Sequence, residues 1–155
     1  MHYLSAADLN RIEQALGVVL PDHYRAFHLT QQELIRQLRE STGEPAEDWL
    51  HLATDAVWLI ETNQLMKLPK QQGPVRGKLC IGGDGGGGFY FIRVDDPTDP
   101  IVYTLPHDEE EEVFDDQLDD YSWSFEGLTA GLDMIDFAQD ILRMYAEIHG
   151  RHQAE

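Results

Sequence analysis

Residues 79–92 read Leu79-Cys80-Ile81-Gly82-Gly83-Asp84-Gly85-Gly86-Gly87-Gly88-Phe89-Tyr90-Phe91-Ile92. Two short apolar runs, rich in β-branched and aromatic residues, flank a stretch that is almost entirely glycine. The pattern predicts strands at residues 78–81 and 89–94 joined by a turn, because such side chains favour strands and glycine permits the positive φ angles of turns. Cys80, the lone cysteine, is predicted to be a buried strand residue rather than a nucleophile.

The glycine run also satisfies the dinucleotide-binding pattern G-x-G-x-x-G through Gly83, Gly85 and Gly88. That motif requires a helix after the glycines, because the pyrophosphate binds at the helix N-terminus. Here a strand-like run follows, and no Lys-Ser or Lys-Thr pair of a phosphate-binding loop is present. A nucleotide-binding enzyme therefore remains only as an unfavoured alternative. The favoured interpretation is a structural turn formed by Gly82, Gly83, Asp84, Gly85, Gly86, Gly87 and Gly88.

Before this hairpin, the chain carries the signals of helices. Ser5 followed by Asp8 predicts a capping box, and Gly17 is placed to end that helix. Pro21 is favoured in the first turn of a second helix. Thr30 and Glu33 predict that this second helix continues through residues 31–39. The second helix is expected to bury one side, made of Tyr24, Phe27 and His28.

The rest of the chain completes the predicted fold. Residues 56–60 form an apolar run of strand type, residues 95–100 a turn and residues 101–105 a further strand. Apolar residues at helical spacing between positions 128 and 148, after Ser124, predict a closing helix of about five turns. The order predicts an α+β fold, one domain over residues 1–155, with an antiparallel sheet of about four to six strands between N-terminal and C-terminal helices.

Composition excludes several function classes. The net charge of −18 makes direct binding to nucleic acid or an anionic membrane improbable, since that binding depends on Lys and Arg. No stretch is long and apolar enough to span a bilayer, and the N-terminus has no signal-peptide pattern, so a cytoplasmic protein is expected. No catalytic motif, metal-ligand spacing or cofactor motif is found, and His149 and His152 are expected at the surface. The expected class is a binding protein that is not an enzyme and needs no metal or cofactor.

The negative charge is concentrated in one part of the chain. Residues 1–93 hold 11 acidic and nine basic residues, whereas residues 94–142 hold 16 acidic residues and no basic one. An evenly acidic protein would spread this charge, whereas a binding face would concentrate it. The sequence therefore predicts a nearly neutral scaffold that carries one acidic face.

The acidic segment, residues 108–123, is the candidate partner-binding site. Runs of like charge are usually solvated loops. Here, however, apolar residues recur at short intervals between the acidic ones, which favours a segment that packs on the domain with its carboxylates outward. Trp49, Trp58 and Trp123 are expected in the core, with Trp123 as the best candidate anchor for a partner. The predicted partner-binding residues are Asp108, Glu109, Glu110, Glu111, Glu112, Phe114, Asp115, Asp116, Asp119, Asp120, Tyr121 and Trp123.

Several stretches, taken in order, resemble the SUKH superfamily of Knr/Smi-type domains. They include the helix ending at Leu16-Gly17, the run Leu20-Pro21-Asp22-His23-Tyr24-Arg25-Ala26-Phe27, the turn and aromatic strand from residue 81 to 92, Val102-Tyr103 followed by His107-Asp108, and Ser124-Phe125-Glu126-Gly127-Leu128. The glycine run is longer than the usual turn of that family, and the second helix runs on where the family often turns at a glycine.

This resemblance implies an α+β fold and, in bacteria, an immunity protein that neutralises a toxin delivered by neighbouring cells. Many such toxins are nucleases, whose basic surface an acidic face could occupy. The predicted partner is thus a cognate protein toxin, bound by a monomer or weak homo-oligomer. An intracellular adaptor that binds an endogenous protein, as in fungal cell-wall signalling, and a metal buffer remain as alternatives.

Overall fold

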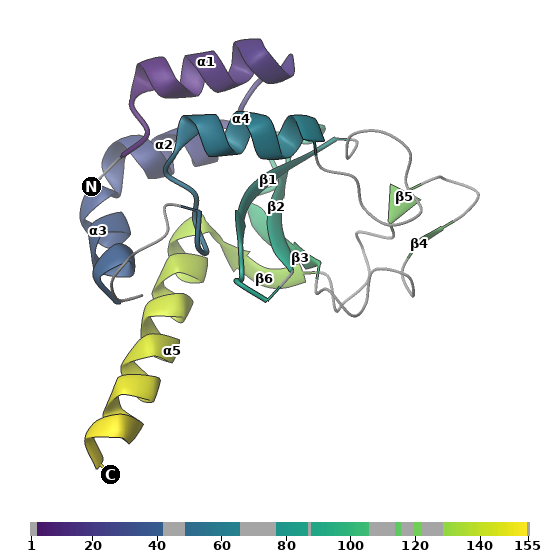
Figure 1. The fold of residues 1–155 in the computed structure, drawn as a ribbon. Helices are drawn as coiled ribbons and strands as arrows, with labels where there is room; N and C mark the ends of the chain where they lie inside the picture. Colours follow the sequence, from purple (N-terminus) through teal and green to yellow (C-terminus); the bar gives the residue numbers. More distant parts are fainter. Residues whose placement is uncertain are drawn as a thin grey trace.

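The structure, a computed structural model, describes residues 3–41, 49–65, 77–86, 88–105, 114–115, 120–121 and 129–154. Within these ranges the chain forms helices, then a meander of strands, then a long helix (Figure 1). In chain order the elements are α1 (Ala6–Leu16), α2 (Asp22–Thr30), α3 (Gln32–Ser41), α4 (Ala56–Leu65), β1 (Lys78–Gly83), β2 (Phe89–Arg93), β3 (Ile101–Leu105), β4 (Phe114–Asp115), β5 (Asp120–Tyr121), β6 (Thr129–Asp133) and α5 (Met134–Ala154).

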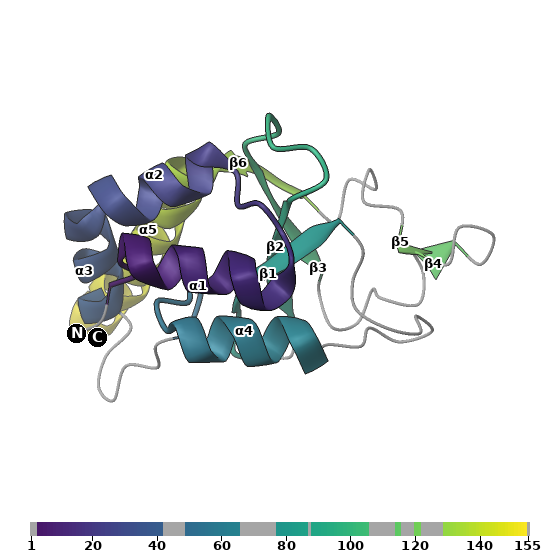
Figure 2. The same ribbon diagram turned by 90° about the horizontal axis from the view of Figure 1, so that it is seen from above.

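The main sheet has four antiparallel strands in the order β1-β2-β3-β6. Helices α1 and α4 lie side by side, with α4 against β1, while α2 and α3 pack against α5 (Figures 1 and 2). The C-terminal half of α5 extends away from the rest of the fold (Figure 1). This arrangement confirms the predicted α+β class and the expected number of strands. One core joins helices to sheet, with fully buried Leu9, Ile12, Tyr24, Leu59, Ile81, Ile92, Val102 and Ala138.

The first helix follows its local signals. The Ser5 hydroxyl accepts a hydrogen bond from the Asp8 amide (3.1 Å), and the Asp8 carboxylate accepts one from the Ser5 amide (3.0 Å), which completes the predicted capping box. Gly17 ends the helix in the left-handed region at φ 66°. Both signals are local, so no tertiary contact is needed to read them.

Residues 32–39 are helical, as predicted, but they form a separate helix, α3, and do not continue the second helix. Gln31, with φ −108° and ψ 36°, separates α2 from α3. The Thr30 hydroxyl donates back to the carbonyl of Ala26 (2.6 Å) instead of capping the next helix. The expected buried side of α2 is confirmed, since Tyr24, Phe27 and His28 are all buried.

Residues 56–60, predicted as a strand, instead begin α4. The Asp55 carboxylate accepts hydrogen bonds from the amides of Val57 (2.9 Å) and Trp58 (3.4 Å), and so caps the helix. Ala56 and Leu59, three residues apart, are the buried residues of α4, as helical periodicity requires. A short apolar run cannot be assigned by periodicity alone, and here the cap decides it.

The closing helix begins later than predicted. Thr129–Asp133 forms β6, which pairs with β3, and α5 starts at Met134. Asp133 marks the boundary, because its carboxylate accepts a hydrogen bond from the Asp136 amide (2.9 Å). The predicted apolar face is confirmed at Ala138 and Ile141, which are buried, but not at Ile135 and Ile148, which are exposed. Within the described ranges, no helix is both long and apolar enough to cross a membrane.

Candidate partner-binding site

Of the acidic segment, the structure describes the backbone of two short strands. β4 and β5 pair antiparallel, with Phe114 opposite Tyr121 and Asp115 opposite Asp120. A hairpin therefore lies inside the segment, so part of it has regular backbone structure. The other predicted partner-binding residues lie outside the described ranges: Asp108, Glu109, Glu110, Glu111, Glu112, Asp116, Asp119 and Trp123.

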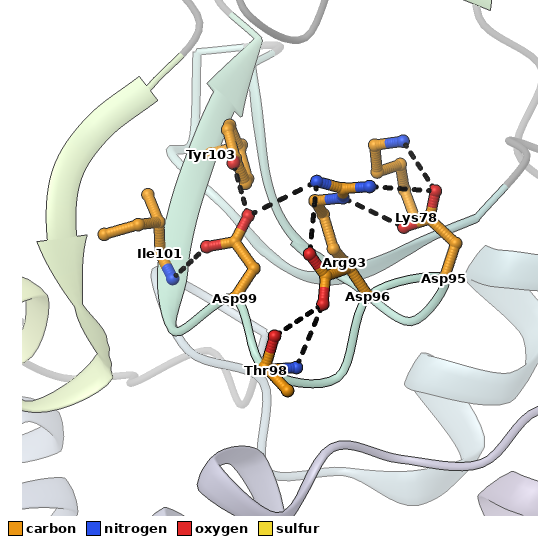
Figure 3. Close-up of polar contacts among 8 residues, drawn as sticks. All are labelled: Lys78, Arg93, Asp95, Asp96, Thr98, Asp99, Ile101 and Tyr103. Atoms are coloured by element: carbon orange, nitrogen blue, oxygen red, sulfur yellow. Dashed lines mark hydrogen bonds and ion pairs between the residues drawn. The ribbon is translucent and has the colours of Figure 1, made fainter.

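The basic residues just before the acidic part of the chain are engaged with the 95–100 turn (Figure 3). Arg93 donates from Nε to Asp95 (3.0 Å) and lies 3.7 Å from an Asp96 oxygen and 3.8 Å from an Asp99 oxygen. Lys78, at the start of β1, approaches Asp95 at 3.9 Å. Partial burial works to raise the pKa of Asp95, but the hydrogen bond from Arg93 and the two positive charges outweigh it and hold this pKa below its usual value.

The carboxylates of this turn also organise its backbone. Asp96 accepts hydrogen bonds from the amide (3.2 Å) and hydroxyl (2.7 Å) of Thr98, which lower its pKa. Asp99 accepts from the amide of Ile101 (3.0 Å) and the hydroxyl of Tyr103 (2.6 Å), fixing the entry into β3. Three of the acids in residues 94–142 thus serve the fold, where Arg93 contacts all three and Lys78 contacts Asp95.

The glycine run divides between strand and turn. Gly82 and Gly83 belong to β1, so the predicted turn is shorter than the run and spans the residues from 84 to 88. The Asp84 carboxylate accepts hydrogen bonds from the amides of Gly86 (2.7 Å) and Gly88 (3.0 Å). These amides are the groups that a phosphate would need. Their engagement by a carboxylate of the same turn disfavours a nucleotide site; Gly87 lies outside the described residues.

Gly82 and Gly83 have a packing role. The chain from Trp49 to Ala53 runs against β1, through hydrogen bonds from the His51 amide to Gly83 (2.7 Å) and from the Ala53 amide to Ile81 (2.7 Å). A Cβ atom on Gly82 would lie 2.0 Å from the carbonyl oxygen of His51. Glycine at this position therefore permits the close approach of a second backbone.

Beside the turn, two tryptophans form one wall of an apolar groove. Trp49 and Trp58 stack with ring centroids 6.3 Å apart and planes 12° from parallel. Both pack against the core but are only partly buried, so the expectation of core positions holds in part. The groove has a volume of about 290 Å³ and is lined by Trp49, Trp58, Gly83, Gly85, Gly88 and Phe89.

A buried polar cluster supports the chain segment that carries Trp49. Arg39 of α3, only 3% exposed, donates to the carbonyls of Leu50 (3.0 Å) and Leu52 and to the hydroxyl of Thr54 (3.2 Å). These bonds satisfy backbone groups of an irregular segment that would otherwise be costly to bury. The sequence did not predict this role, because the acceptors of Arg39 lie 11 to 15 residues further along the chain and meet it only after folding.

His51 belongs to the same cluster and has left-handed backbone geometry, with φ 64°. Its Nε2 lies 2.9 Å from the hydroxyl of Tyr145 on α5, which ties the segment to the long helix. Burial lowers the pKa of His51 to about 4, and the charge of Arg39 acts in the same direction. The imidazole is therefore neutral near pH 7 and acts as a structural hydrogen-bonding group.

His149 and His152 are expected at the surface and not as metal ligands. His149 lies exposed on α5, as expected, and the side chain of His152 lies outside the described part. Among the described residues, no group of three or more His, Cys, Asp or Glu side chains is placed to hold a metal ion.

Comparison with known proteins adds one finding. The family model described as SMI1 / KNR4 family (SUKH-1) matches residues 3–124 of the chain. The match runs from the segment before α1 through the glycine turn and the whole acidic segment, and ends before β6 and α5. No curated protein and no solved structure matches the chain.

Proposed function

The chain belongs to the SMI1 / KNR4 (SUKH-1) family, and from this premise we propose that it is an immunity protein that binds and neutralises a basic protein toxin through its acidic segment. A nuclease is the toxin class that fits best, since a nuclease must present a positive surface to nucleic acid. The proposed partner site comprises the acidic and aromatic residues of residues 108–123.

The distribution of charge carries this proposal. Residues 94–142 hold 16 acidic residues and no basic one. The nearest preceding basic residues, Lys78 and Arg93, are turned toward Asp95, Asp96 and Asp99. Part of their charge is thus balanced by the 95–100 turn, and the sequence places no basic residue between positions 94 and 142 to balance the acidic segment locally.

The hairpin supplies a second line of support. Its register places Asp115 opposite Asp120, and like charges at directly opposed positions destabilise an antiparallel pair. A basic partner would relieve this repulsion on binding. Complementary charge also raises association rates, to about 10⁸–10⁹ M⁻¹s⁻¹ at low salt, which suits an inhibitor that must bind before its own cell is damaged.

The proposal assigns no catalysis to the chain. Neutralisation by occupying the toxin surface needs only binding, and the residues that could suggest an enzyme have structural uses. The glycine-turn amides of Gly86 and Gly88 are bonded to Asp84. Burial raises the pKa of Cys80 to about 12, so its thiol stays protonated at neutral pH.

Co-expression with the toxin-like product of a neighbouring reading frame tests the proposal. Wild-type protein should rescue growth and bind that product with a rate that falls steeply as salt rises. Glu110→Lys combined with Glu111→Lys should slow association by about tenfold or more at low salt, because steering depends on local charge. The readout is association kinetics at two or more salt concentrations.

A matched control separates local from overall charge. Glu61→Lys combined with Glu147→Lys makes the same change in net charge at two exposed positions on α4 and α5. Association should stay near the wild-type rate in this control. Equal loss in both double variants would contradict the acidic segment as the site. Capture of an endogenous protein, with no protection against the toxin, would instead support the adaptor function.

A further inference from the structure

A second site lies away from the acidic segment, where α2, the residue before β3 and the first turn of α5 meet. It is a half-open pocket of about 240 Å³, lined by His23, Ala26, Phe27, Thr30, Gln31, Pro100, Asp133, Met134 and Ile135. Pockets that bury a drug-sized ligand usually measure about 300–1,000 Å³. This pocket is therefore better matched to a single side chain than to a metabolite.

The walls of the pocket are mainly apolar. Phe27 and Met134 are 3% exposed and form fixed surfaces, while Ile135 is 38% exposed at the mouth. Pro100 adds a rigid ring on the side of the 95–100 turn. An occupant must therefore present an apolar stem for most of its length.

The charge around the pocket is negative. Asp133 is the acidic residue in its lining, and no Lys or Arg is among the lining residues. One Asp133 oxygen, Oδ1, accepts the hydrogen bond from the Asp136 amide (2.9 Å). Asp133 is itself exposed, so its carboxylate can be reached by a cation from solvent.

His23 is the titratable group inside the pocket. Both of its ring nitrogens are shielded from solvent. Burial lowers the pKa of His23, and the nearby backbone of Asp99 together with the carboxylates of Asp99, Asp133 and Asp22 only partly offsets this effect. The ring is therefore neutral at neutral pH, and it adds no positive charge that would repel a cation.

We propose that this pocket receives a lysine or arginine side chain of a partner protein, with its aliphatic stem between Phe27 and Met134 and its charged end at Asp133. Lys and Arg combine an apolar stem with a cationic head, which is the combination that the walls and the mouth present. The inference rests on the proposed function, in that a basic toxin is the protein expected to supply this side chain. The matched family region ends at residue 124, so Asp133, Met134 and Ile135 lie beyond it.

Small probes test the pocket without the toxin. N-acetyl-lysine methylamide and N-acetyl-norleucine methylamide differ essentially in the ammonium group, and NMR titration can follow the methyl signals of Met134 and Ile135 and the ring signals of His23. The lysine probe should give saturable shifts at these residues. The norleucine probe should bind about two- to fivefold more weakly, the size expected of a partly exposed ion pair.

Asp133→Asn is the decisive variant. Asparagine is as good an N-cap as aspartate, so α5 should still begin at the same residue while the charge is removed. The preference for the lysine probe should disappear in this variant and persist in Asp136→Asn, which removes an equal charge from the same helix turn outside the pocket lining.

The outcomes separate this inference from the proposed function. Equal binding of both probes, absence of saturable shifts, or a preference that survives Asp133→Asn would overturn the cation pocket, whatever the acidic segment does. The double variant Glu110→Lys and Glu111→Lys tests the acidic segment separately. If this variant binds the toxin normally while the probes still bind the pocket as described, the pocket is supported and the acidic segment is not the toxin-binding site. Asp133→Asn should also weaken binding of the toxin about two- to fivefold relative to the wild-type protein, the size expected for loss of one partly exposed ion pair.

Discussion

The side chain of Asn63 bonds both backbone groups of Cys80. Asn63 Oδ1 accepts from the Cys80 amide (2.8 Å), and Asn63 Nδ2 donates to the Cys80 carbonyl (3.0 Å). Asn63 lies on α4 and Cys80 in β1, at the position where the β1–β2 register shifts before Gly82. The amide side chain thus replaces a neighbouring strand for one residue, and it fixes α4 on the edge of the sheet.

Asn63→Ala should destabilise the domain by about 1–3 kcal/mol, because it leaves a buried amide and carbonyl of β1 without their partner. Gln64→Ala is the control: Gln64 is exposed, and the hydrogen bond from its side chain to the carbonyl of Ala15 is long at 3.5 Å. Its effect should stay within about 0.5 kcal/mol. Urea denaturation monitored by tryptophan fluorescence measures both, and equal midpoints for the two variants would contradict the role given to Asn63.

Gly82→Ala should be among the most damaging small substitutions in the chain. The new Cβ would lie 2.0 Å from the His51 carbonyl oxygen, which belongs to backbone and cannot rotate away. The strand and the 49–53 segment must separate, at a cost of about 1–3 kcal/mol or more. In Gly86→Ala, the nearest atom to the new Cβ is the Asp84 Oδ1 at 3.6 Å, so that variant should unfold near the wild-type midpoint. A Gly82→Ala protein as stable as Gly86→Ala would show that this close approach is not needed.

The correct sequence predictions depended on local signals. The capping box of Ser5 and Asp8, the left-handed Gly17 and the strands around the glycine run are each written within a few residues. Where the sequence failed, contacts between distant residues decided the outcome. β6 is a strand because it pairs with β3, although its residues continue the helical spacing of α5.

The acidic segment could be predicted from the sequence, but the pocket beside α2 and α5 could not. Charge can be counted, so the acidic segment could be found without a structure, whereas a pocket depends on how distant elements meet. His23, Pro100 and Asp133 are far apart in the chain and come together only after folding. The buried contacts of Arg39 with residues 50–54 were missed for the same reason.

The glycine turn should not bind nucleotides. Asp84 already engages the Gly86 and Gly88 amides, and its negative charge opposes a phosphate. Addition of millimolar ATP or NAD should leave the melting temperature unchanged in a thermal-shift assay, since a ligand stabilises a protein only in proportion to its binding. Asp84→Ala should lower the melting temperature, because the two amides lose their acceptor. A saturable rise in melting temperature with either nucleotide would revive the nucleotide-binding alternative.

Because His28 is buried, the domain should lose stability in mild acid. Its ring is fully buried, packs edge-on against Tyr24 and makes no hydrogen bond to a described residue. Burial lowers the pKa of His28 to about 3, and the charge of Arg39 adds to this. In the unfolded chain the histidine pKa is near 6.5, so below this pH the unfolded chain binds a proton at His28 that the folded protein does not bind. The stabilising contribution is therefore complete above pH 6.5 and is lost progressively as the pH falls from 6.5 toward 3.

The measurement is the free energy of unfolding at pH 7, 6 and 5, where carboxylates are still mostly ionised. His28→Leu should reduce its slope with pH by up to about 1.4 kcal/mol per pH unit, the contribution of one proton. The free energy of unfolding of His28→Leu should still fall with falling pH, because burial also lowers the pKa of His51, to about 4. His149→Leu changes an exposed residue on α5 and should keep the wild-type slope. Identical slopes in wild type and His28→Leu would mean that the folded protein admits a proton at His28, and hence that α2 opens to solvent in this pH range.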